Sequence, residues 1–171
     1  RELRDDFVQA LEDCQADEAI RVLIITGKGK AFSAGFDLKE LASPQSGTAA
    51  ETADNIIARA MEAFDGPIIG AINGHAITGG FELALACDVI IASEQARFAD
   101  THARVGILAG WGLSQRLPRL IGLSRAKELS LTGRPLFAQE AYEWGLVNHV
   151  VAADELLPSA IAMAQEMCAC V

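Results

Sequence analysis

The feature that most constrains the fold is a series of short apolar runs that are rich in β-branched residues. These runs cover residues 22–26, 67–72, 89–92 and 147–151. Runs of this length and composition are typical of strands that are buried on both faces of a sheet. Apolar residues also recur at helical spacing over residues 2–16, 56–64, 79–86, 113–121, 124–131 and 138–144, and again from 154 onwards. Strands that alternate with helices predict an α/β fold, with a layered, largely parallel sheet and helices packed around it.

Length and charge limit the classes of protein to which the chain can belong. Its 171 residues, 51% of them hydrophobic, are enough for a single domain with a substantial core, which we expect to span 1–171. Acidic residues outnumber basic ones by 23 to 14, giving a net charge of −9 that argues against nucleic acid or anionic membranes as partners. The apolar runs are shorter than the roughly 18 to 20 residues of a membrane span, so we expect a cytoplasmic protein.

Weaker evidence about the protein comes from its cysteines, its histidines and the two ends of the chain. The four cysteines are expected to be reduced thiols, because an apolar chain of this length needs no disulfide framework. The three histidines are scattered singly, so no metal site is predicted. The chain starts without methionine inside one helical pattern and stops inside another, which predicts a fragment of a longer protein.

Two glycine-bearing turns follow the first two buried runs, at residues 31–39 and 73–82. Open α/β sheets bind their ligands at the carboxyl ends of strands, which is where both turns are expected to lie. In the second turn, Gly79 and Gly80 open a helix, and the free N–H groups of a first helical turn attract negative charge. Tight packing of a strand against a helix explains such a glycine pair equally well, so spacing alone leaves both interpretations open.

Taken together, the two turns resemble segments of the enoyl-CoA hydratase/isomerase family, also called the crotonase family. Further similar segments follow in the same order, at residues 87–92, 115–122, 131–133 and 141–147. Ordered, separated motifs of this kind are specific at the level of a family. The resemblance implies a crotonase-like ββα-spiral fold and a homotrimer or dimer of trimers. It also implies that this chain lacks the family's N-terminal strands and its C-terminal helical region.

The resemblance further implies a substrate and a way of holding it. The substrate is an acyl-CoA thioester, so coenzyme A is part of the substrate and no separate cofactor is expected. The backbone N–H groups of Phe36 and Gly79 would form an oxyanion hole that stabilises an enolate. Trp111, in a glycine-rich loop, is expected either to line the acyl pocket or to pack in the core. The candidate substrate-binding residues are Ala34, Phe36, Asp37, Leu38, Lys39, Gly79 and Trp111.

Two residues are candidates for acid–base catalysis. Glu82 matches one of the family's two acid/base glutamates, although a glutamate in a first helical turn also favours the helix dipole without any catalytic role. His102 occupies the position of the second glutamate. An imidazole transfers protons near neutral pH, so His102 either pairs with Glu82 in catalysis or only lines the pocket. Asp100 and Arg104, close by in sequence, are expected to form a surface ion pair with each other or a subunit contact.

Three functions remain open at the level of the sequence. The first is reversible addition of water to a 2-enoyl-CoA, and the second is double-bond isomerisation or other enolate chemistry that needs one base. The third is a non-catalytic acyl-CoA-binding or regulatory protein that retains the oxyanion hole. We also predict that residues 43–55 are mobile without ligand, because they are small and polar. A final expectation is that His102→Glu raises hydratase activity by restoring a pair of carboxylates.

Overall fold

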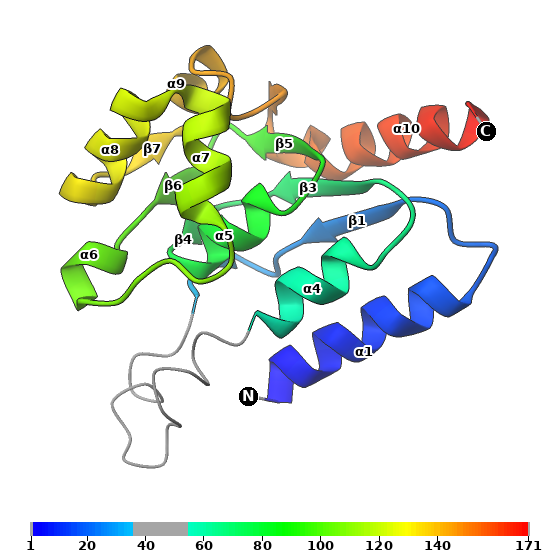
Figure 1. Ribbon diagram of the computed structural model, residues 1–171. Coiled ribbons are helices and arrows are strands. Elements are labelled where there is room, and N and C mark those ends of the chain that lie inside the picture. The colour runs from blue at the N-terminus through cyan, green and yellow to red at the C-terminus, as the bar shows by residue number, and fades with distance from the viewer. Residues whose placement is uncertain (1, 36–54, 171) are drawn as a thin grey trace.

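The chain folds into two sheets with helices on the outside (Figure 1). The structure is a computed structural model that describes residues 2–35 and 55–170. The first sheet has the strand order β1-β3-β5-β8, and every neighbouring pair in it is parallel. Its strands are β1 (Leu23–Thr26), β3 (Ile68–Ile72), β5 (Val89–Ser93) and β8 (His149–Val151). These four strands confirm the apolar runs that were predicted to form a parallel sheet.

The second sheet has the order β2-β4-β6-β7 and is parallel except for the pair of β6 with β7. Three times, a short turn carries the chain from a strand of the first sheet into a strand of the second, from β1 to β2, β3 to β4 and β5 to β6. The carboxyl ends of β2 and β4 therefore lie side by side. The strands of this sheet are β2 (Ala31–Ser33), β4 (His75–Ile77), β6 (Arg97–Ala99) and β7 (Leu136–Phe137).

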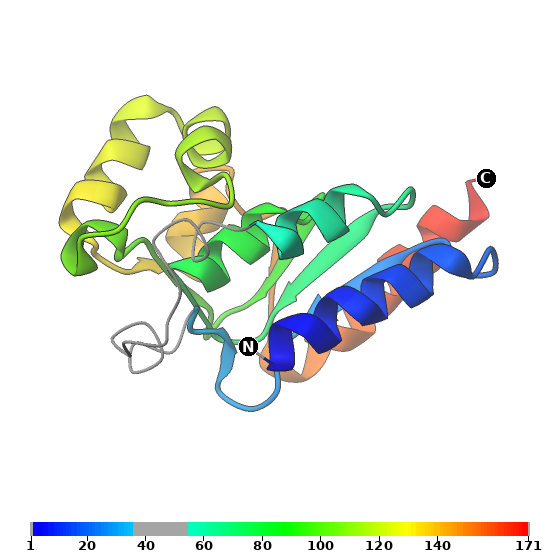
Figure 2. The same ribbon diagram turned by 60° about the horizontal axis from the view of Figure 1, so that its bottom comes forward.

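The helices cover the first sheet on both faces (Figure 1). Helices α1 and α4 lie on one face of it and α10 on the other, while α7 and α8 gather at the end of the molecule away from the C-terminus (Figure 2). A turn of 3-10 helix, Ala153–Glu155, precedes α10. The helices are α1 (Glu2–Ala16), α4 (Ile56–Glu62), α5 (Gly79–Leu85), α6 (His102–Val105), α7 (Leu113–Ile121), α8 (Leu123–Thr132), α9 (Ala138–Glu143) and α10 (Leu156–Ala169).

Strand β3 shows why the apolar runs are continuous rather than alternating. Successive side chains of a strand point to opposite faces, so a strand covered on both sides needs apolar residues at every position. Ile68 packs in the cluster that α1 and α4 form, whereas Ile69 and Ala71 pack against α10. All five residues of β3 are buried. Within the described part of the chain, no helix is long and apolar enough to cross a lipid bilayer.

The second sheet is the part of the fold that the sequence did not predict. Strands β2 and β4 fall within the two glycine-bearing turns, β6 lies in a segment to which no strand was assigned, and each of the three contains only three residues. Three residues are too few for an alternating pattern to be recognised, so these strands depend on pairing with their neighbours. The segment 43–55, predicted to be mobile, lies outside the described residues except for Asn55.

Candidate active site

The two glycine-bearing turns meet at the carboxyl ends of β2 and β4, where the backbones approach closely. A methyl group placed on Gly35 would lie 3.1 Å from the backbone nitrogen of Gly79. A methyl group on Gly80 would lie 1.9 Å from the carbonyl oxygen of Ser33, which is far inside van der Waals contact. Gly80 is therefore required for packing, as one interpretation of the glycine pair predicted. The same packing brings the first turn to the beginning of α5.

Thr78, the residue before α5, has a strained backbone that directs the start of the helix. Its φ of 54° and ψ of −111° are unusual for a residue with a β-branched side chain. Its carbonyl oxygen accepts the N–H groups of Phe81 and Glu82, both at 3.0 Å, and its hydroxyl bonds to the hydroxyl of Thr101. The N–H groups of Gly79 and Gly80 precede the first helical hydrogen bonds of α5. Strained residues of this kind cluster at functional sites.

Glu82 lies in α5 with its carboxylate buried, at 3% exposure. Its Oε1 accepts the backbone N–H groups of Trp111, at 2.7 Å, and Leu113, at 3.3 Å. These two bonds hold the glycine-rich loop before α7 against α5. A methyl group on Gly79 would lie 3.5 Å from the Trp111 ring, so this indole covers the start of the helix. One oxygen of Glu82 is therefore structural, and the other is available to a different partner.

That partner is His102, which lies between two carboxylates. Its Nε2 is 3.4 Å from Oε2 of Glu82, and its Nδ1 is 2.6 Å from Oδ1 of Asp100. Asp100 is 3% exposed and His102 6% exposed, so the three side chains form a buried row of proton-carrying groups. Such a row can accept a proton at one end and release one elsewhere.

The charge state of this row follows from its contacts. Burial by itself would lower the pKa of His102, but hydrogen bonds to Asp100 and Glu82 and the charges of both carboxylates raise the pKa to about 9. Burial would raise the pKa of Asp100, yet hydrogen bonds from His102 and from the Ser130 hydroxyl hold it below its usual value. At neutral pH His102 is therefore an imidazolium that is hydrogen-bonded to Asp100 through Nδ1 and in ionic contact with Glu82 at Nε2.

The structure brings together most of the described candidates for the site. Gly79, Glu82, His102 and Trp111 lie in one cluster, and Ala34 is exposed beside it, next to Gly35. The remaining candidates, Phe36, Asp37, Leu38 and Lys39, lie outside the described residues. In the described ranges, no group of three or more histidine, cysteine, aspartate or glutamate side chains is arranged to hold a metal ion.

The expected ion pair between Asp100 and Arg104 is wrong. Arg104 instead donates from Nε and Nη2 to the carbonyl oxygen of Thr132, at 3.2 and 2.8 Å. Asp100 turns inward because its Oδ1 also accepts the backbone N–H of His102, at 3.1 Å. An aspartate that bonds to the backbone two residues later is a common turn, and this turn places the carboxylate beside the ring of His102. The spacing Asp-x-His was the signal that could have identified Asp100.

Two surface grooves lie away from this cluster. One, of about 570 Å³, is bounded by α9, β8 and α10, and another, of about 720 Å³, lies between the ends of α4 and α5. None of Gly79, Glu82 or His102 lines either groove. The convergence of titratable groups at a strained turn is therefore a better guide to the site than the size of a hollow.

Comparison with known proteins identifies the family of this chain. The model of the enoyl-CoA hydratase/isomerase family matches residues 1–170, and the chain belongs to this family. It is 47% identical over 165 residues to a protein named probable enoyl-CoA hydratase 1, peroxisomal, from Arabidopsis thaliana. It is 41% identical over 162 residues to 2,3-dehydroadipyl-CoA hydratase of Escherichia coli K12. These alignments cover 96% and 94% of this chain, but only 62% and 63% of the two relatives.

Solved structures give the same result for the fold. The enoyl-CoA hydratase of Mycobacterium tuberculosis H37Rv superposes with a TM-score of 0.83 at 51% identity, over 97% of this chain and 70% of that one. The enoyl-CoA hydratase of Bacillus anthracis superposes with a TM-score of 0.90 at 43% identity, over 98% and 66% respectively. The crotonase-like α/β fold that the sequence predicted is thereby confirmed.

Proposed function

We propose that the protein hydrates a 2-enoyl-CoA thioester reversibly, with Glu82 and His102 as its acid–base pair. The observation that carries this proposal is the 3.4 Å contact between Oε2 of Glu82 and Nε2 of His102, buried beside the start of α5. Hydration needs a base that removes a proton from water and an acid that donates a proton to carbon. A carboxylate in contact with an imidazolium supplies both at neutral pH.

The reaction divides between the two groups as follows. Oε2 of Glu82 removes a proton from water, and the resulting hydroxide forms a bond to C3 of the enoyl group. The electrons of the double bond move toward the thioester, and the negative charge collects on its oxygen. Nε2–H of His102 then delivers a proton to C2. A proton passes from Glu82 to His102, which restores the starting state and leaves H on C2 and OH on C3.

The thioester oxygen is held by the backbone N–H groups of Phe36 and Gly79 in this proposal. The position of Gly79 supports this role. Gly79 is the first residue of α5, so its N–H has no acceptor within the helix. Two donors that are already oriented stabilise a developing oxyanion by several kcal/mol. The acyl-CoA would contact the residues that the family resemblance indicates, Ala34 and 36–39, and Trp111, whose ring covers Gly79.

Turnover of a short trans-2-enoyl-CoA tests the proposal, with the loss of its conjugated absorbance as the readout. We expect hydration by the wild type and a loss of about 10²-fold or more in Glu82→Gln, the usual contribution of one acid/base group. Glu140→Gln, at a partly exposed carboxylate outside this cluster, is the matched control and should retain full activity. Turnover of a 3-enoyl-CoA instead would indicate isomerisation, and acyl-CoA binding without either reaction would indicate a binding protein.

Assembly and location form the remaining part of the proposal. We expect a homotrimer or dimer of trimers in the cytoplasm, with no cofactor apart from the coenzyme A of the substrate. Large apolar side chains that are exposed on this chain, such as Leu108 at 93% and Leu131 at 78%, supply surface for subunit contacts. Sedimentation equilibrium gives the oligomeric state, and an unaffected rate in the presence of a chelator checks that no metal is needed.

A further inference from the structure

Both hydrogen bonds that the structure gives to the Asp100 carboxylate come from His102. Its Oδ1 accepts two hydrogen bonds from that one residue, from the ring Nδ1 at 2.6 Å and from the backbone N–H at 3.1 Å. The Ser130 hydroxyl, from α8, is also one of the groups that lower the pKa of this carboxylate. A side chain that is 3% exposed and makes both of these hydrogen bonds cannot change its orientation without breaking them.

We propose that Asp100 is a positioning residue that fixes the imidazole of His102 with Nδ1 toward itself and Nε2 toward Glu82. The proposal deepens the proposed function and rests on it, because it concerns how the acid of that reaction is held. A histidine ring presents two similar nitrogens, and the hydrogen bond at one of them determines what the other can do. With Nδ1–H bonded to Asp100, Nε2 is the nitrogen left for Glu82 and for the substrate.

The position of Asp100 in the chain supports this role. His102 begins α6, a helix of only four residues, so little of its own element holds the ring in place. The backbone and ring bonds to Asp100 together hold the ring at the end of β6. Small displacements of a catalytic group lower rates strongly, so such support has a direct effect on catalysis.

The groups that face the ring come from three elements. Asp100 follows β6 and Glu82 lies on α5, and both carry a negative charge, while α8 contributes the neutral Ser130 through Asp100. Arg104, on α6 itself, donates to Thr132 instead of to this cluster. Replacing Asp100 by asparagine therefore removes one of the two carboxylates that act on His102 and leaves a side chain of the same shape.

The first test observes the ring directly in the protein without substrate. In the wild type, the ring nitrogen shifts in NMR should place a proton on Nδ1 throughout the titration, with a midpoint near the raised pKa of about 9. In Asp100→Asn we expect the midpoint to fall by about one pH unit or more, because one neighbouring charge is lost. Asp88→Asn is the matched control, since Asp88 accepts only the backbone N–H of Ile68 among the bonds described, at 2.8 Å. An unchanged His102 titration in folded Asp100→Asn overturns the proposal.

The second test measures turnover and separates positioning from general damage. We expect Asp100→Asn to lower kcat about tenfold or more while KM stays within about threefold, as for a group that acts in the transition state. Combined with His102→Gln, Asp100→Asn should cause no further loss, whereas independent losses would contradict action through His102. A wild type that hydrates no enoyl-CoA would refute the proposed function, while the NMR result would still decide the role of Asp100.

Discussion

Two regions of the molecule hold a cation between two carboxylates, and they differ in their access to water. In the site, His102 lies 2.6 Å from Asp100 and 3.4 Å from Glu82, and none of the three side chains is more than 8% exposed. At the corner of α8 and α9, Arg134 lies 2.7 Å from both Glu128 and Glu140. The side chains of that cluster are 30%, 49% and 32% exposed. The shortest distance in each cluster is similar, at 2.6 and 2.7 Å, so we expect burial to account for most of the difference in energy.

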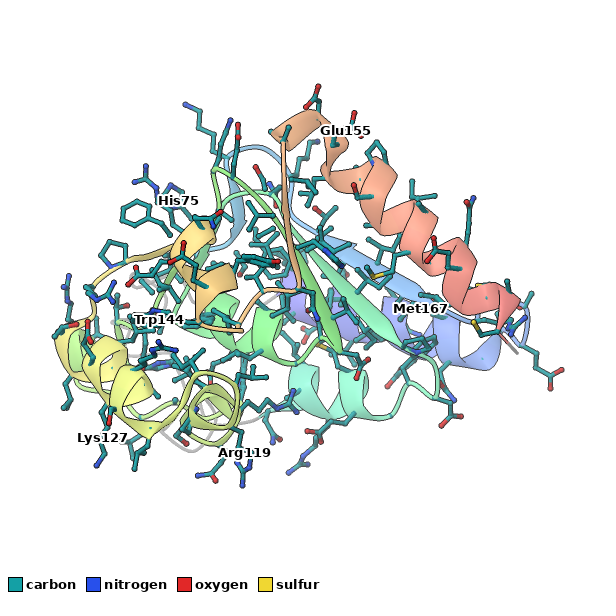
Figure 3. The ribbon with its side chains drawn as sticks, turned by 90° about the horizontal axis from the view of Figure 1, so that it is seen from above. His75, Arg119, Lys127, Trp144, Glu155 and Met167 are labelled. Carbon is teal, nitrogen blue, oxygen red and sulfur yellow. The ribbon has the colours of Figure 1, made fainter. Side chains whose placement is uncertain are left out.

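The difference in solvent exposure indicates which of these charges contribute most to the stability of the fold. Exposed ion pairs contribute little because water screens them and because long side chains lose freedom when they pair. A buried charge without its partner is costly because no water replaces the partner. The exposed cluster has one further support, since the Arg134 and Arg125 guanidinium groups lie 5.1 and 4.9 Å from the ring centre of Trp144. Figure 3 shows Trp144 far from Met167 of α10, at the end where α8 and α9 lie.

The largest effect is expected when the central cation of each cluster is replaced by glutamate. His102→Glu would place three carboxylates together in a buried space, and we expect a loss of about 3–5 kcal/mol in the free energy of unfolding. Arg134→Glu makes the same change between Glu128 and Glu140 and should cost only about 1–2 kcal/mol, for two partly exposed ion pairs. Urea denaturation of both variants measures the two losses. Equal losses would show that burial does not separate the two regions.

The contact with Asp100 changes the expectation that His102→Glu raises hydratase activity. That expectation assumed a pair of carboxylates, whereas the structure places Asp100 as a third. We therefore expect His102→Glu alone to be poorly folded and inactive. Adding Asp100→Asn leaves Glu82 and the new glutamate as the pair, and should recover part of both stability and turnover.

A second comparison uses one glycine from each region. Gly80→Ala would drive a methyl group to 1.9 Å from the Ser33 carbonyl oxygen, which is backbone and cannot move aside. We expect a loss of about 1–3 kcal/mol or more. Gly133→Ala, at the end of α8, meets the flexible Arg104 side chain at 2.5 Å, and its φ of +60° should cost about 1 kcal/mol. Thermal unfolding of the two variants shows which substitution destabilises the protein more. A larger loss of stability in Gly133→Ala than in Gly80→Ala would contradict this prediction.

The sequence predicted the first sheet and part of the candidate site, for identifiable reasons. The apolar runs identified its strands, and the family resemblance identified Glu82 and His102, which lie 20 positions apart in the chain. The role of Asp100 was missed because charged residues close in sequence usually form ion pairs on the surface. The Asp-x-His spacing, which predicts a turn that brings the carboxylate to the histidine ring, was not considered. The link from Glu82 to the Trp111 N–H could not be predicted, because it depends on where the loop before α7 settles after packing.

The third prediction concerns pH and again separates the two clusters. His102 has a pKa of about 9 in the folded protein and an ordinary value of 6.5, so its proton stabilises the folded state fully below pH 6.5. That stabilisation is lost as pH rises through about 9. Between these values the free energy of unfolding should fall more steeply in the wild type than in His102→Gln. Arg134→Gln should match the wild-type slope, because a guanidinium stays protonated throughout this range. Parallel curves for wild type and His102→Gln would contradict the raised pKa.

The smallest effect is expected when the partly exposed Arg134 is replaced by a neutral side chain instead of an acidic one. Arg134 makes a bidentate contact with Glu140, at 2.7 and 3.0 Å, which lowers the pKa of Glu140 through hydrogen bonding. Bidentate geometry places an exposed pair near the upper end of its usual range, so Arg134→Gln should cost about 1 kcal/mol in low salt. The loss should shrink in 1 M NaCl, where charges are screened beyond about 3 Å. Urea denaturation at both salt concentrations measures the change, with His102→Gln as the buried counterpart whose loss salt should hardly alter. If salt reduced both losses equally, the buried site would be open to solvent, and the contrast between the two clusters would not hold.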